Sequence, residues 1–502
     1  MCGIIGIVNQ APRHQAAPDL YVGLINMQHR GKQGAGIVTY DGRRYYAEKG
    51  PGELAQAFII PSSYEARQKL AQLLASQGNE EQWTHILPPP SVSSMLGNSG
   101  IGHTRYGTAG ISSHLNLQPI EGSFHGEPFF LAHNGNLVNA KRLRQTARLS
   151  DGFSDTVVIT TILSQSQERN FEQALLGLIR DLEGAFNFMV LYRGFVYAIR
   201  DRFGFHPLTI GRREHADGID NIVASETCAL DVLRASRVRE VKPGEIVRLE
   251  PNGHITTMHF TQDTNIKLDI FEFIYFLRPD SQWYGVEAGQ ARYQMGRQLA
   301  LEHPLDVDTI IPIADSGNEA ALGYWEGLAL RGSRAIFRPW GLFRPHFVSR
   351  TFIEPVQSQR EQYLRLKFNP RQSQLYNRHI AVVDDSIVRG NTIAATLRLL
   401  KEAGVASVSM VVSSPPYRYP DFYGIDTYRI QNELLAQSLN GNTQSVAKSI
   451  ARRFGLRKLG YLSLVATLKS VSQLSDGWLK SKDFYTGPFT GQYPAGLGDF
   501  AT

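Results

Sequence analysis

Apolar positions in the first 260 residues fall in short runs that turn-forming residues separate. The runs are GIIGIV (3–8), AGIVTY (35–40), FFLAHNGNL (129–137), FNFMVLY (186–192) and FVYAIR (195–200). Runs of this length, with few long helical periods between them, predict strands in packed and mostly antiparallel sheets. The segment from Pro61 to Val92 is rich in Gln, Ala and Leu and has three consecutive prolines near its end, which predicts an inserted helix and a loop.

Beyond residue 265 the pattern changes to strands that alternate with helices. The segments HIAVV (379–383) and ASVSMVV (406–412) flank a helical pattern over 393–404. In that pattern Ile393, Leu397 and Leu400 share one face. Thr392 stands near the start of the predicted helix, and Gly404 provides a stop. This alternation predicts an α/β domain with a mainly parallel sheet, which differs in class from the amino-terminal part.

Composition restricts the classes of protein that this chain of 502 residues can belong to. Only 2 residues are cysteines, which excludes a disulfide scaffold and a thiolate zinc site. There is no apolar run of the ~18–20 residues that span a bilayer, and the first ten residues lack the basic region of a secretory signal. We therefore expect a cytoplasmic protein with no membrane partner.

The charge is weakly positive, because 52 Lys and Arg residues exceed 46 Asp and Glu residues by 6. The densest basic stretch, residues 452–458, is short and is interpreted as a solvated helix end or turn. A nucleic-acid-binding protein remains an alternative that rests on net charge alone, and we expect no nucleic-acid partner. An anionic small substrate fits the charge equally well.

The first candidate for chemistry is Cys2, which directly precedes the first predicted strand. Removal of Met1 would place a free α-amine on the same residue as the thiol. The pKa of an α-amine is about 7.7–8.0, against about 10.4 for lysine, so a useful fraction is neutral at physiological pH. That amine can accept the proton of its own thiol and so activate Cys2 as a nucleophile.

Three other polar segments supply groups that such a nucleophile needs. The planar guanidinium of Arg105 suits a carboxylate. Asn134 and Gly135 offer a side-chain amide and a backbone N–H, which are the donors of an oxyanion hole. Asp155 could hold an ammonium group. Each segment taken alone also fits an ordinary polar turn.

Taken together, these segments resemble the class II glutamine amidotransferases in order and approximate spacing. The segments are MCGIIGIV (1–8), QHRGKQGAG (28–36), GHTRYGTAG (102–110), AHNGNL (132–137) and SDT (154–156). The resemblance implies an α+β domain, built as a four-layer αββα sandwich, in which Cys2 releases ammonia from glutamine through a thioester. It implies that Arg105 and Asp155 bind the α-carboxylate and α-ammonium of glutamine. Gln33 stands where the family usually carries an acid.

The second candidate for chemistry lies in residues 379–392, HIAVVDDSIVRGNT. Five largely apolar residues predict a buried strand, two acids close it, and a loop of small residues leads into the helix. The N–H groups at the start of that helix would point at an anion in the loop. Asp384 and Asp385 could accept ribose hydroxyls or hold Mg²⁺ through oxygen. The motifs of a P-loop and of a dinucleotide fold are absent from the sequence.

This segment is similar to the phosphoribosyl pyrophosphate (PRPP) loop of type I phosphoribosyltransferases. The resemblance implies that the loop from Ser386 to Thr392 cradles the 5′-phosphate, and that Asp384 and Asp385 bind ribose and metal. It also implies that Ser316 helps to hold Mg²⁺ and pyrophosphate. The cradle residues that it assigns are Ser386, Arg389, Gly390, Asn391 and Thr392.

Both resemblances together imply a transfer of glutamine-derived ammonia to C1 of PRPP. The products are 5-phosphoribosylamine, pyrophosphate and glutamate, in the first step of purine synthesis. The resemblance implies a glutaminase domain over 2–260, a phosphoribosyltransferase domain over 261–470 and a tail over 471–502 that packs back on the enzyme. It further implies a homo-oligomer and inhibition by purine nucleotides.

The chain departs from the family pattern in the loop that is expected to close over PRPP. Arg344 and Arg350 keep the cations at its two ends, but His346 replaces a permanent charge, Ser349 replaces a glycine and Pro345 stiffens the loop. His206 also stands where the family has arginine. These changes leave open an alternative, a divergent paralogue with impaired transfer that acts as a PRPP-responsive glutaminase or a regulatory binding protein.

One branch of the family holds a [4Fe–4S] cluster through four cysteines. The matching positions here are Cys228, Asp421, Tyr485 and Pro488. A single thiol cannot hold such a cluster, so we predict none.

Overall fold

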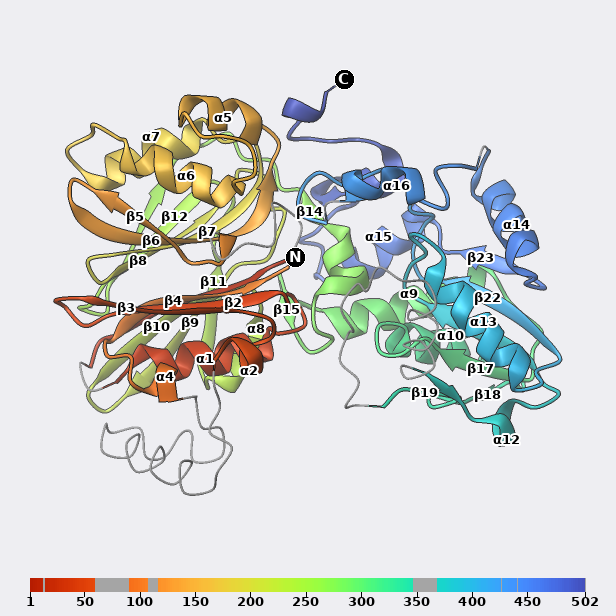
Figure 1. The fold of residues 1–502 in the computed structure, drawn as a ribbon. Coiled ribbons are helices and arrows are strands. Elements are labelled where there is room, and N and C mark those ends of the chain that lie inside the picture. Colours follow the sequence, from red (N-terminus) through yellow and green to blue (C-terminus); the bar gives the residue numbers. More distant parts are fainter. Residues whose placement is uncertain are drawn as a thin grey trace.

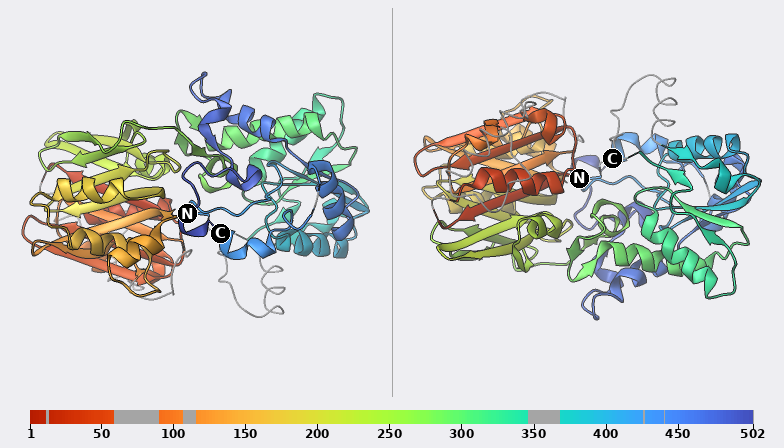
Figure 2. Two further views of the ribbon diagram at one scale, coloured as in Figure 1. Left: turned by 90° about the horizontal axis from the view of Figure 1, so that it is seen from above. Right: turned by 90° about the horizontal axis from the view of Figure 1, so that it is seen from below.

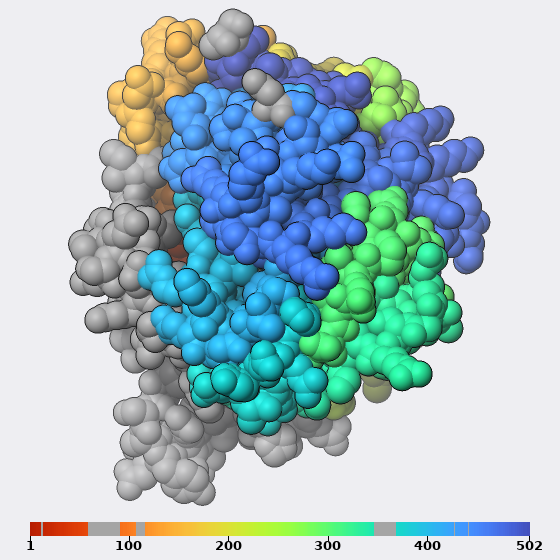
Figure 3. Space-filling model, turned by 90° about the vertical axis from the view of Figure 1, so that its right-hand side faces the viewer, coloured from red at the N-terminus to blue at the C-terminus, as the bar shows by residue number. Residues whose placement is uncertain are grey.

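The computed structural model describes residues 1–11, 14–58, 90–106, 116–345, 368–425, 427–439 and 441–501. The chain forms two halves that lie side by side, and its amino terminus lies at their junction (Figures 1 and 2). Figure 3 views the molecule from the side of the carboxy-terminal half, whose green, cyan and blue segments cover most of that face. The insertion that we expect between Pro61 and Val92 lies outside the described residues, apart from its last three positions.

The first sheet is antiparallel and contains, within the described residues, seven strands in the order β11-β9-β10-β1-β4-β2-β3. Its strands are β1 (Gly3–Asn9), β2 (Gly34–Tyr40), β3 (Tyr45–Pro51), β4 (Ser99–Arg105), β9 (Thr209–His215), β10 (Gly218–Ala224) and β11 (Ser236–Glu240). The central strand β1 is buried throughout. Its register with β4 places Gly3 opposite Thr104, so the starting point of β1 lies beside the end of β4.

The second sheet is also antiparallel, with the order β13-β12-β8-β7-β6-β5 among the described strands. Its strands are β5 (Ile120–Phe124), β6 (Glu127–Leu137), β7 (Gly184–Tyr192), β8 (Phe195–Arg200), β12 (Glu245–Leu249) and β13 (Ile255–His259). Alternate residues such as Ile4 on β1 and Met189 on β7 point into one apolar layer between the two sheets. The expected strands in the first 260 residues are therefore confirmed.

Helices cover the outer face of each sheet and complete four layers (Figure 1). The helices on the first sheet are α1 (Ala16–Asn26), α2 (Leu54–Ala57), α4 (Pro90–Ser93) and α8 (Thr227–Val232). The helices on the second sheet are α5 (Ala140–Thr146), α6 (Asp155–Ser164) and α7 (Phe171–Arg180). A separate apolar cluster lies under each helical layer. This arrangement confirms the α+β four-layer αββα sandwich.

The carboxy-terminal half contains a five-stranded parallel sheet in the order β18-β17-β21-β22-β23 within the described residues. Its strands are β17 (Thr309–Pro312), β18 (Ile336–Phe337), β21 (His379–Asp384), β22 (Ser407–Val412) and β23 (Leu459–Tyr461). One face packs on α9 (Ala288–Glu302), α10 (Asn318–Ala329) and α15 (Leu464–Ser472). The other packs on α13 (Asn391–Glu402) and α14 (Thr443–Phe454). The expected parallel α/β domain is confirmed.

Short elements connect these layers. The short strands are β14 (Leu268–Asp269), β15 (Gln282–Trp283), β16 (Val286–Glu287), β19 (Leu342–Phe343), β20 (Asn369–Pro370) and β24 (Phe484–Tyr485). The short helices are η2 (Glu272–Phe276), α12 (Gln372–Leu375), η3 (Thr427–Glu433), η4 (Ser481–Asp483), α16 (Gly487–Thr490) and η5 (Gly498–Phe500). Strand β24 pairs with β14, so the end of the chain returns to the junction of the two halves.

Helix α13 begins at the end of the loop that follows β21. It begins at Asn391, two residues before the apolar pattern predicts, because Gly390 at φ +81° turns the loop into the first helical residue. It ends at Glu402, and Gly404 at φ +74° follows as the predicted stop. Ile393 and Leu400 are buried against the sheet. The loop between β21 and α13 is therefore held between a strand of the sheet and a helix that packs on that sheet.

Candidate active site

Cys2 lies at the start of β1, where three elements of the amino-terminal half meet. Its backbone N–H donates to Oδ1 of Asn134 on β6, at 2.9 Å. The N–H of Tyr106, just after β4, lies 3.4 Å from the Cys2 sulfur. Because the β1–β4 register brings the end of β4 to Cys2, Arg105 also lies at this site. The structure therefore brings together Cys2, Arg105 and Asn134, which are far apart in the sequence.

The Cys2 thiol is not prepared as a thiolate by its surroundings. Burial raises its pKa, and the charge of the amino terminus, the N–H of Tyr106 and the charges of Arg105 and Arg30 only partly oppose that effect. The thiol is therefore neutral at physiological pH and needs a base to become a nucleophile. Met1 precedes it in a buried position, 2% exposed.

Asn134 and Gly135 lie side by side on the inner part of β6. The Nδ2 group of Asn134 is buried and has no hydrogen-bond acceptor among the described residues, while its Oδ1 is used by Cys2. A buried donor without an acceptor is costly unless a ligand supplies one. Gly135 has φ +144°, and a Cβ at this position would lie 2.1 Å from the carbonyl oxygen of Ala185. Only glycine allows this approach of β6 to β7.

Asp155 is the first residue of α6, which Ser154 caps through its side chain. Burial opposes its ionisation, but His133 and the N–H groups of Leu137 and Thr156 outweigh burial and lower the pKa of Asp155. The Asp155 carboxylate lies 3.4 Å from Nδ1 of His133. It is therefore an anion at neutral pH, and it is held in place by two backbone donors.

The QHRG segment holds Arg105 and Cys2 in place through its backbone and its arginine. A Cβ on Gly31 would lie 2.5 Å from the carbonyl carbon of Arg105, so this glycine allows a close approach. The N–H of Gln33 donates to the carbonyl of Arg105 at 3.0 Å, whatever side chain residue 33 carries. Nε of Arg30 donates to the carbonyl of Cys2 at 2.9 Å.

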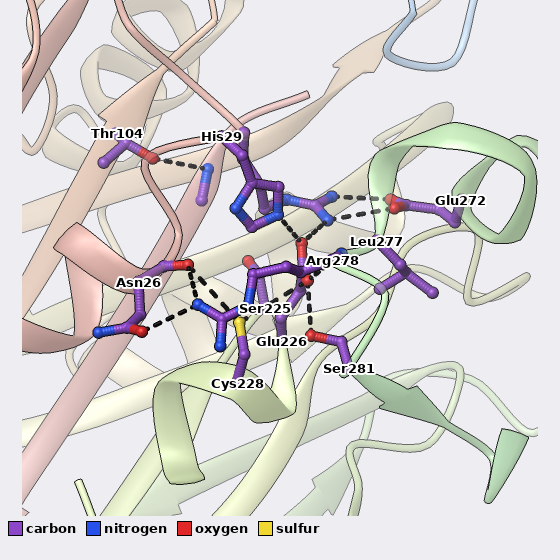
Figure 4. Close-up of polar contacts among 12 residues, drawn as sticks. Asn26, His29, Thr104, Ser225, Glu226, Cys228, Glu272, Leu277, Arg278 and Ser281 are labelled. Atoms are coloured by element: carbon purple, nitrogen blue, oxygen red, sulfur yellow. Dashed lines mark hydrogen bonds and ion pairs between the residues drawn. The ribbon is translucent and has the colours of Figure 1, made fainter. Parts of the chain in front are cut away.

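Arg30 also joins the two halves of the molecule, which the sequence patterns did not reveal. Its guanidinium is fully buried and pairs with Glu226 at 2.6 Å and with Glu272 of η2 at 2.7 Å. Glu226 further accepts hydrogen bonds from His29 and Ser281 (Figure 4). Burial opposes ionisation of Glu226, but His29 and Arg30 outweigh it and hold the pKa of Glu226 well below its usual range. This buried set is called the Arg30 network below.

His206, which stands where the family has arginine, lies on the edge of the Arg30 network. Its Nδ1 is 3.3 Å from Oε1 of Glu272, and its Nε2 is 2.7 Å from the carbonyl oxygen of Tyr423. It therefore contacts both the interdomain carboxylate and the carboxy-terminal half. The substitution therefore changes a contact between the halves.

A cavity of about 740 Å³ lies between the amino-terminal half and the parallel sheet. Asp384 and Asp385 close β21 at its edge, each about 5% exposed. Every predicted residue of the PRPP loop lines this cavity, as do Ser316 and Arg344. Arg344 also forms an ion pair with Asp315. The other two loop cations, His346 and Arg350, lie outside the described residues, as does Ser349.

The opposite wall of this cavity comes from the amino-terminal half. Gln28, His29, Lys32 and Tyr106 line it. Tyr106 therefore lies between Cys2, which its N–H contacts, and the cavity that holds the paired aspartates. Sequence reasoning did not assign this position, although Tyr106 belongs to the quoted segment GHTRYGTAG.

The donors around the paired aspartates fit Mg²⁺. Asp384, Asp385 and the hydroxyl of Ser316 are oxygen donors on one cavity, which is the chemistry that this ion prefers. The four positions of the iron–sulfur cluster do not fit such a group. Asp421 accepts a hydrogen bond from Tyr485 at 2.9 Å, and burial raises the pKa of the single thiol, Cys228.

Relatives of known activity match almost the whole chain. Residues 103–232 match the family described as a glutamine amidotransferase domain. The amidophosphoribosyltransferase of Synechococcus elongatus is 33% identical over 99% of this chain and 92% of its own length. That of Methanothermobacter thermautotrophicus is also 33% identical, over 99% of this chain and 95% of its own length.

Two solved structures have the same fold. Glutamine PRPP amidotransferase from B. subtilis, complexed with ADP and GMP, matches with a TM-score of 0.81 and 32% identity, and the match covers 98% of this chain and 97% of that one. A structure described as the allosteric regulatory enzyme of purine biosynthesis also has a TM-score of 0.81, at 33% identity over 98% and 96% of the two chains.

These likenesses confirm both resemblances seen in the sequence and do not favour a regulatory paralogue or a nucleic-acid-binding protein. Among the described residues, each helix is too short or too polar to cross a membrane. The enzyme class is a pentosyltransferase with glutamine amidotransferase activity. The chain belongs to the amidophosphoribosyltransferase family.

Proposed function

We propose that Cys2 hydrolyses glutamine and that the released ammonia reacts with PRPP at the paired aspartates, giving 5-phosphoribosylamine, pyrophosphate and glutamate. The observation that carries this assignment is the cavity between the halves. Tyr106, which contacts Cys2, lines one wall, and Asp384 and Asp385 line the other. We infer that ammonia passes from one site to the other across this cavity.

The glutaminase step begins with removal of Met1, which leaves an α-amine on Cys2. The amine takes the thiol proton, and the sulfur attacks the side-chain amide carbon of glutamine. Nδ2 of Asn134 and the N–H of Gly135 stabilise the oxyanion of the tetrahedral intermediate. The C–N bond then breaks, the amine returns its proton, and ammonia leaves a thioester that water hydrolyses to glutamate and free Cys2.

Arg105 and Asp155 fix the amino-acid end of glutamine. The guanidinium of Arg105 binds the α-carboxylate through paired hydrogen bonds. Asp155 binds the α-ammonium group, and its lowered pKa keeps it ionised when that ammonium is present. These two contacts select a free amino acid over a peptide-bound glutamine.

In the transferase site the 5′-phosphate lies at the start of α13, a helix of 12 residues. Ser386, Arg389, Gly390, Asn391 and Thr392 form this cradle. Asp384 and Asp385 bind the ribose hydroxyls. Ammonia forms a bond to C1 as the bond to pyrophosphate breaks, and Arg344, His346 and Arg350 offset the negative charge that develops on pyrophosphate.

Mg²⁺ would be held by Asp384, Asp385 and Ser316, and when bound it supplies charge neutralisation for the pyrophosphate group. We also propose a glutaminase domain over 2–260, a phosphoribosyltransferase domain over 261–470 and a tail over 471–502. Purine nucleotides are proposed as inhibitors, since one relative was solved with ADP and GMP. A homo-oligomer in the cytoplasm completes the proposal.

Mass spectrometry after reaction with an electrophilic glutamine analogue tests the nucleophile assignment. We expect one adduct, on Cys2, in an amino-terminal peptide that lacks Met1. Glutamine should protect against the adduct, and the buried thiol Cys228 should remain unmodified. Retention of Met1 in active protein, or an adduct elsewhere with Cys2 free, would show that the assigned mechanism is wrong.

A further inference from the structure

A cluster of two histidines and one aspartate lies away from both active sites, at the far end of the first sheet. His215 ends β9, Asp220 lies on β10, and His14 lies in the connection between β1 and α1. Asp220 is the register partner of Asn9, the last residue of β1, whereas Cys2 precedes the first. At about 3.3 Å per strand residue, the cluster lies roughly 20 Å from Cys2.

Potential ligand atoms of these three side chains converge. One nitrogen from each histidine and one carboxylate oxygen all lie within 4.8 Å of one another. The His14 and His215 rings meet edge to face, with centroids 4.5 Å apart. Nδ1 of His14 is 3.7 Å from Oδ1 of Asp220. Two ligands of a tetrahedral Zn²⁺ ion are about 3.3–3.5 Å apart, so a small movement suffices.

Asp220 carries a polar atom that the surrounding protein leaves without a donor. Its side chain is fully buried, and Oδ1 has no hydrogen-bond partner within the described ranges. The other oxygen, Oδ2, is held by Nε of Arg213 at 2.9 Å and by Nε2 of His215 at 2.6 Å. A metal ion would provide Oδ1 with the partner that it lacks. It would also replace the proton in the hydrogen bond between His215 and Oδ2.

The charges around the cluster favour a cation. Arg213 is buried between Asp220 and Asp19, and Asp217 lies on the other side of His14. Two carboxylates thus contact the guanidinium of Arg213, and a third lies beside His14. Asp217 is 3.9 Å from Nε2 of His14, the nitrogen opposite the one that faces Asp220. This distance is too long for a hydrogen bond, but a small shift would let the carboxylate accept the second N–H of the ring and orient the histidine for metal binding.

We propose that His14, His215 and Asp220 bind a divalent transition-metal ion of the Zn²⁺ class, with water as the fourth ligand. Two imidazoles and one carboxylate suit Zn²⁺ or Co²⁺ better than Mg²⁺, which prefers oxygen alone. The two histidines are 13% and 17% exposed, so an ion can enter from solvent. The ion would fasten the β9–β10 hairpin to the connection between β1 and α1, a structural role separate from catalysis.

Zn²⁺ binding to the full-length chain, measured against a chromophoric chelator, tests the proposal. The Cys2→Ser background removes the half-buried Cys2 thiol as a competitor, and excess Mg²⁺ occupies the paired aspartates. We expect one tightly bound ion per chain and a higher unfolding temperature with Zn²⁺. His14→Gln should weaken binding by more than about 10-fold and abolish the Zn²⁺-dependent stabilisation. Co²⁺ should give the visible absorption of a tetrahedral site without a thiolate band.

His259→Gln is the matched control, because His259 is an exposed histidine at the end of β13 of the same half. It should bind Zn²⁺ as the parent does. His215→Asn provides a second test that does not depend on the folding of the first variant. Equal Zn²⁺ affinity in the parent and in both site variants would overturn the proposal. So would stability that responds to pH but not to Zn²⁺, which would identify the cluster as a proton-binding site only.

Discussion

At the scale of single residues, the proposed glutamine site depends on charged groups whose orientation the backbone fixes. Arg105 ends a strand and Asp155 begins a helix, and each is about 8% exposed. Two N–H groups hold the Asp155 carboxylate. Substrate therefore meets a site whose ionic groups are already in position, which reduces the entropy lost on binding.

Arg105→Lys should lower kcat/KM for glutamine by about 10- to 100-fold, because lysine keeps the charge but loses the planar pair of donors. Transfer from added ammonia should be unchanged, since it bypasses this site. Steady-state rates with each nitrogen source measure the effect. Arg142→Lys, in an exposed pair with Glu183, is the control and should behave as wild type. An equal loss with glutamine and ammonia would count against the assignment of Arg105.

The candidate residues could be found in the sequence because their motifs are local. Cys2, Asn134 and Asp384 each lie in a short segment with a recognisable chemistry. The Arg30 network could not be found in this way, because Glu226 lies 196 residues and Glu272 lies 242 residues from Arg30 in the chain. A buried pair of this kind leaves no periodic pattern. The segment QHRGKQGAG contains Arg30, but nothing in it indicates that this residue meets Glu226 and Glu272.

At the scale of elements, the close approach of β6 to β7 determines where the proposed oxyanion donors lie. Gly135 is opposite Phe186 in their register, and the carbonyl of Ala185 occupies the place of a side chain. The strand therefore presents Asn134 next to Cys2 only while residue 135 has no Cβ. The distance between β6 and β7 therefore determines whether the donors on β6 lie beside Cys2.

Gly135→Ala should displace β6 from β7, because its Cβ would meet backbone at 2.1 Å and its φ is positive. We expect a loss of stability greater than that of Gly152→Ala, together with a loss of glutamine-dependent turnover. Gly152 has φ +106° with open space around it, so that control should cost only about 1–2 kcal/mol of backbone strain. Denaturant unfolding of both variants gives the comparison. Equal losses would show that the close contact is unimportant.

Strands were easier to predict from the sequence than the boundaries around the loops. The apolar runs gave β1, β2, β6, β7, β8, β21 and β22 to within a few residues. Helix α13 starts two residues before the predicted position, because Asn391 and Thr392 are polar and carry no apolar signal although they are helical. The predicted insertion and the central loop residues lie outside the described residues and stay predictions.

At the scale of the whole molecule, the Arg30 network links the nucleophile to the transferase half. Arg30 touches the Cys2 carbonyl and also Glu272 of η2, whose neighbours Phe271, Tyr275 and Phe276 line the cavity. One buried guanidinium therefore connects the residue that carries the proposed nucleophile with the wall of the cavity. Removal of either carboxylate would leave the buried Arg30 guanidinium with one anionic partner in place of two.

Glu226→Gln should destabilise the protein by about 3–5 kcal/mol at neutral pH, because it breaks a buried ion pair. The pKa of Glu226 is lowered by folding, so its contribution is present above the unfolded value of 4.5 and is lost as the pH falls towards the folded value. The difference in unfolding free energy between variant and wild type should therefore shrink below pH 4.5. Denaturant unfolding at several pH values measures it.

Glu183→Gln is the control for that pH series, since its exposed pair with Arg142 should contribute at most about 1 kcal/mol at any pH. A difference for Glu226→Gln that stays constant from neutral to acid pH would contradict the role of its carboxylate. The fold class of each half was predictable, but the contact between the halves was not, since it depends on tertiary packing.

The central claim is that ammonia made at Cys2 is used at the paired aspartates. Pyrophosphate release with glutamine or with ammonia, compared in wild type, Cys2→Ala and Asp385→Asn, tests it most directly. We predict that Cys2→Ala loses the glutamine-supported rate and keeps the ammonia-supported rate, while Asp385→Asn loses both and still releases glutamate. Glutamine-supported release that survives in Cys2→Ala, or ammonia-supported release that disappears with it, would contradict the account.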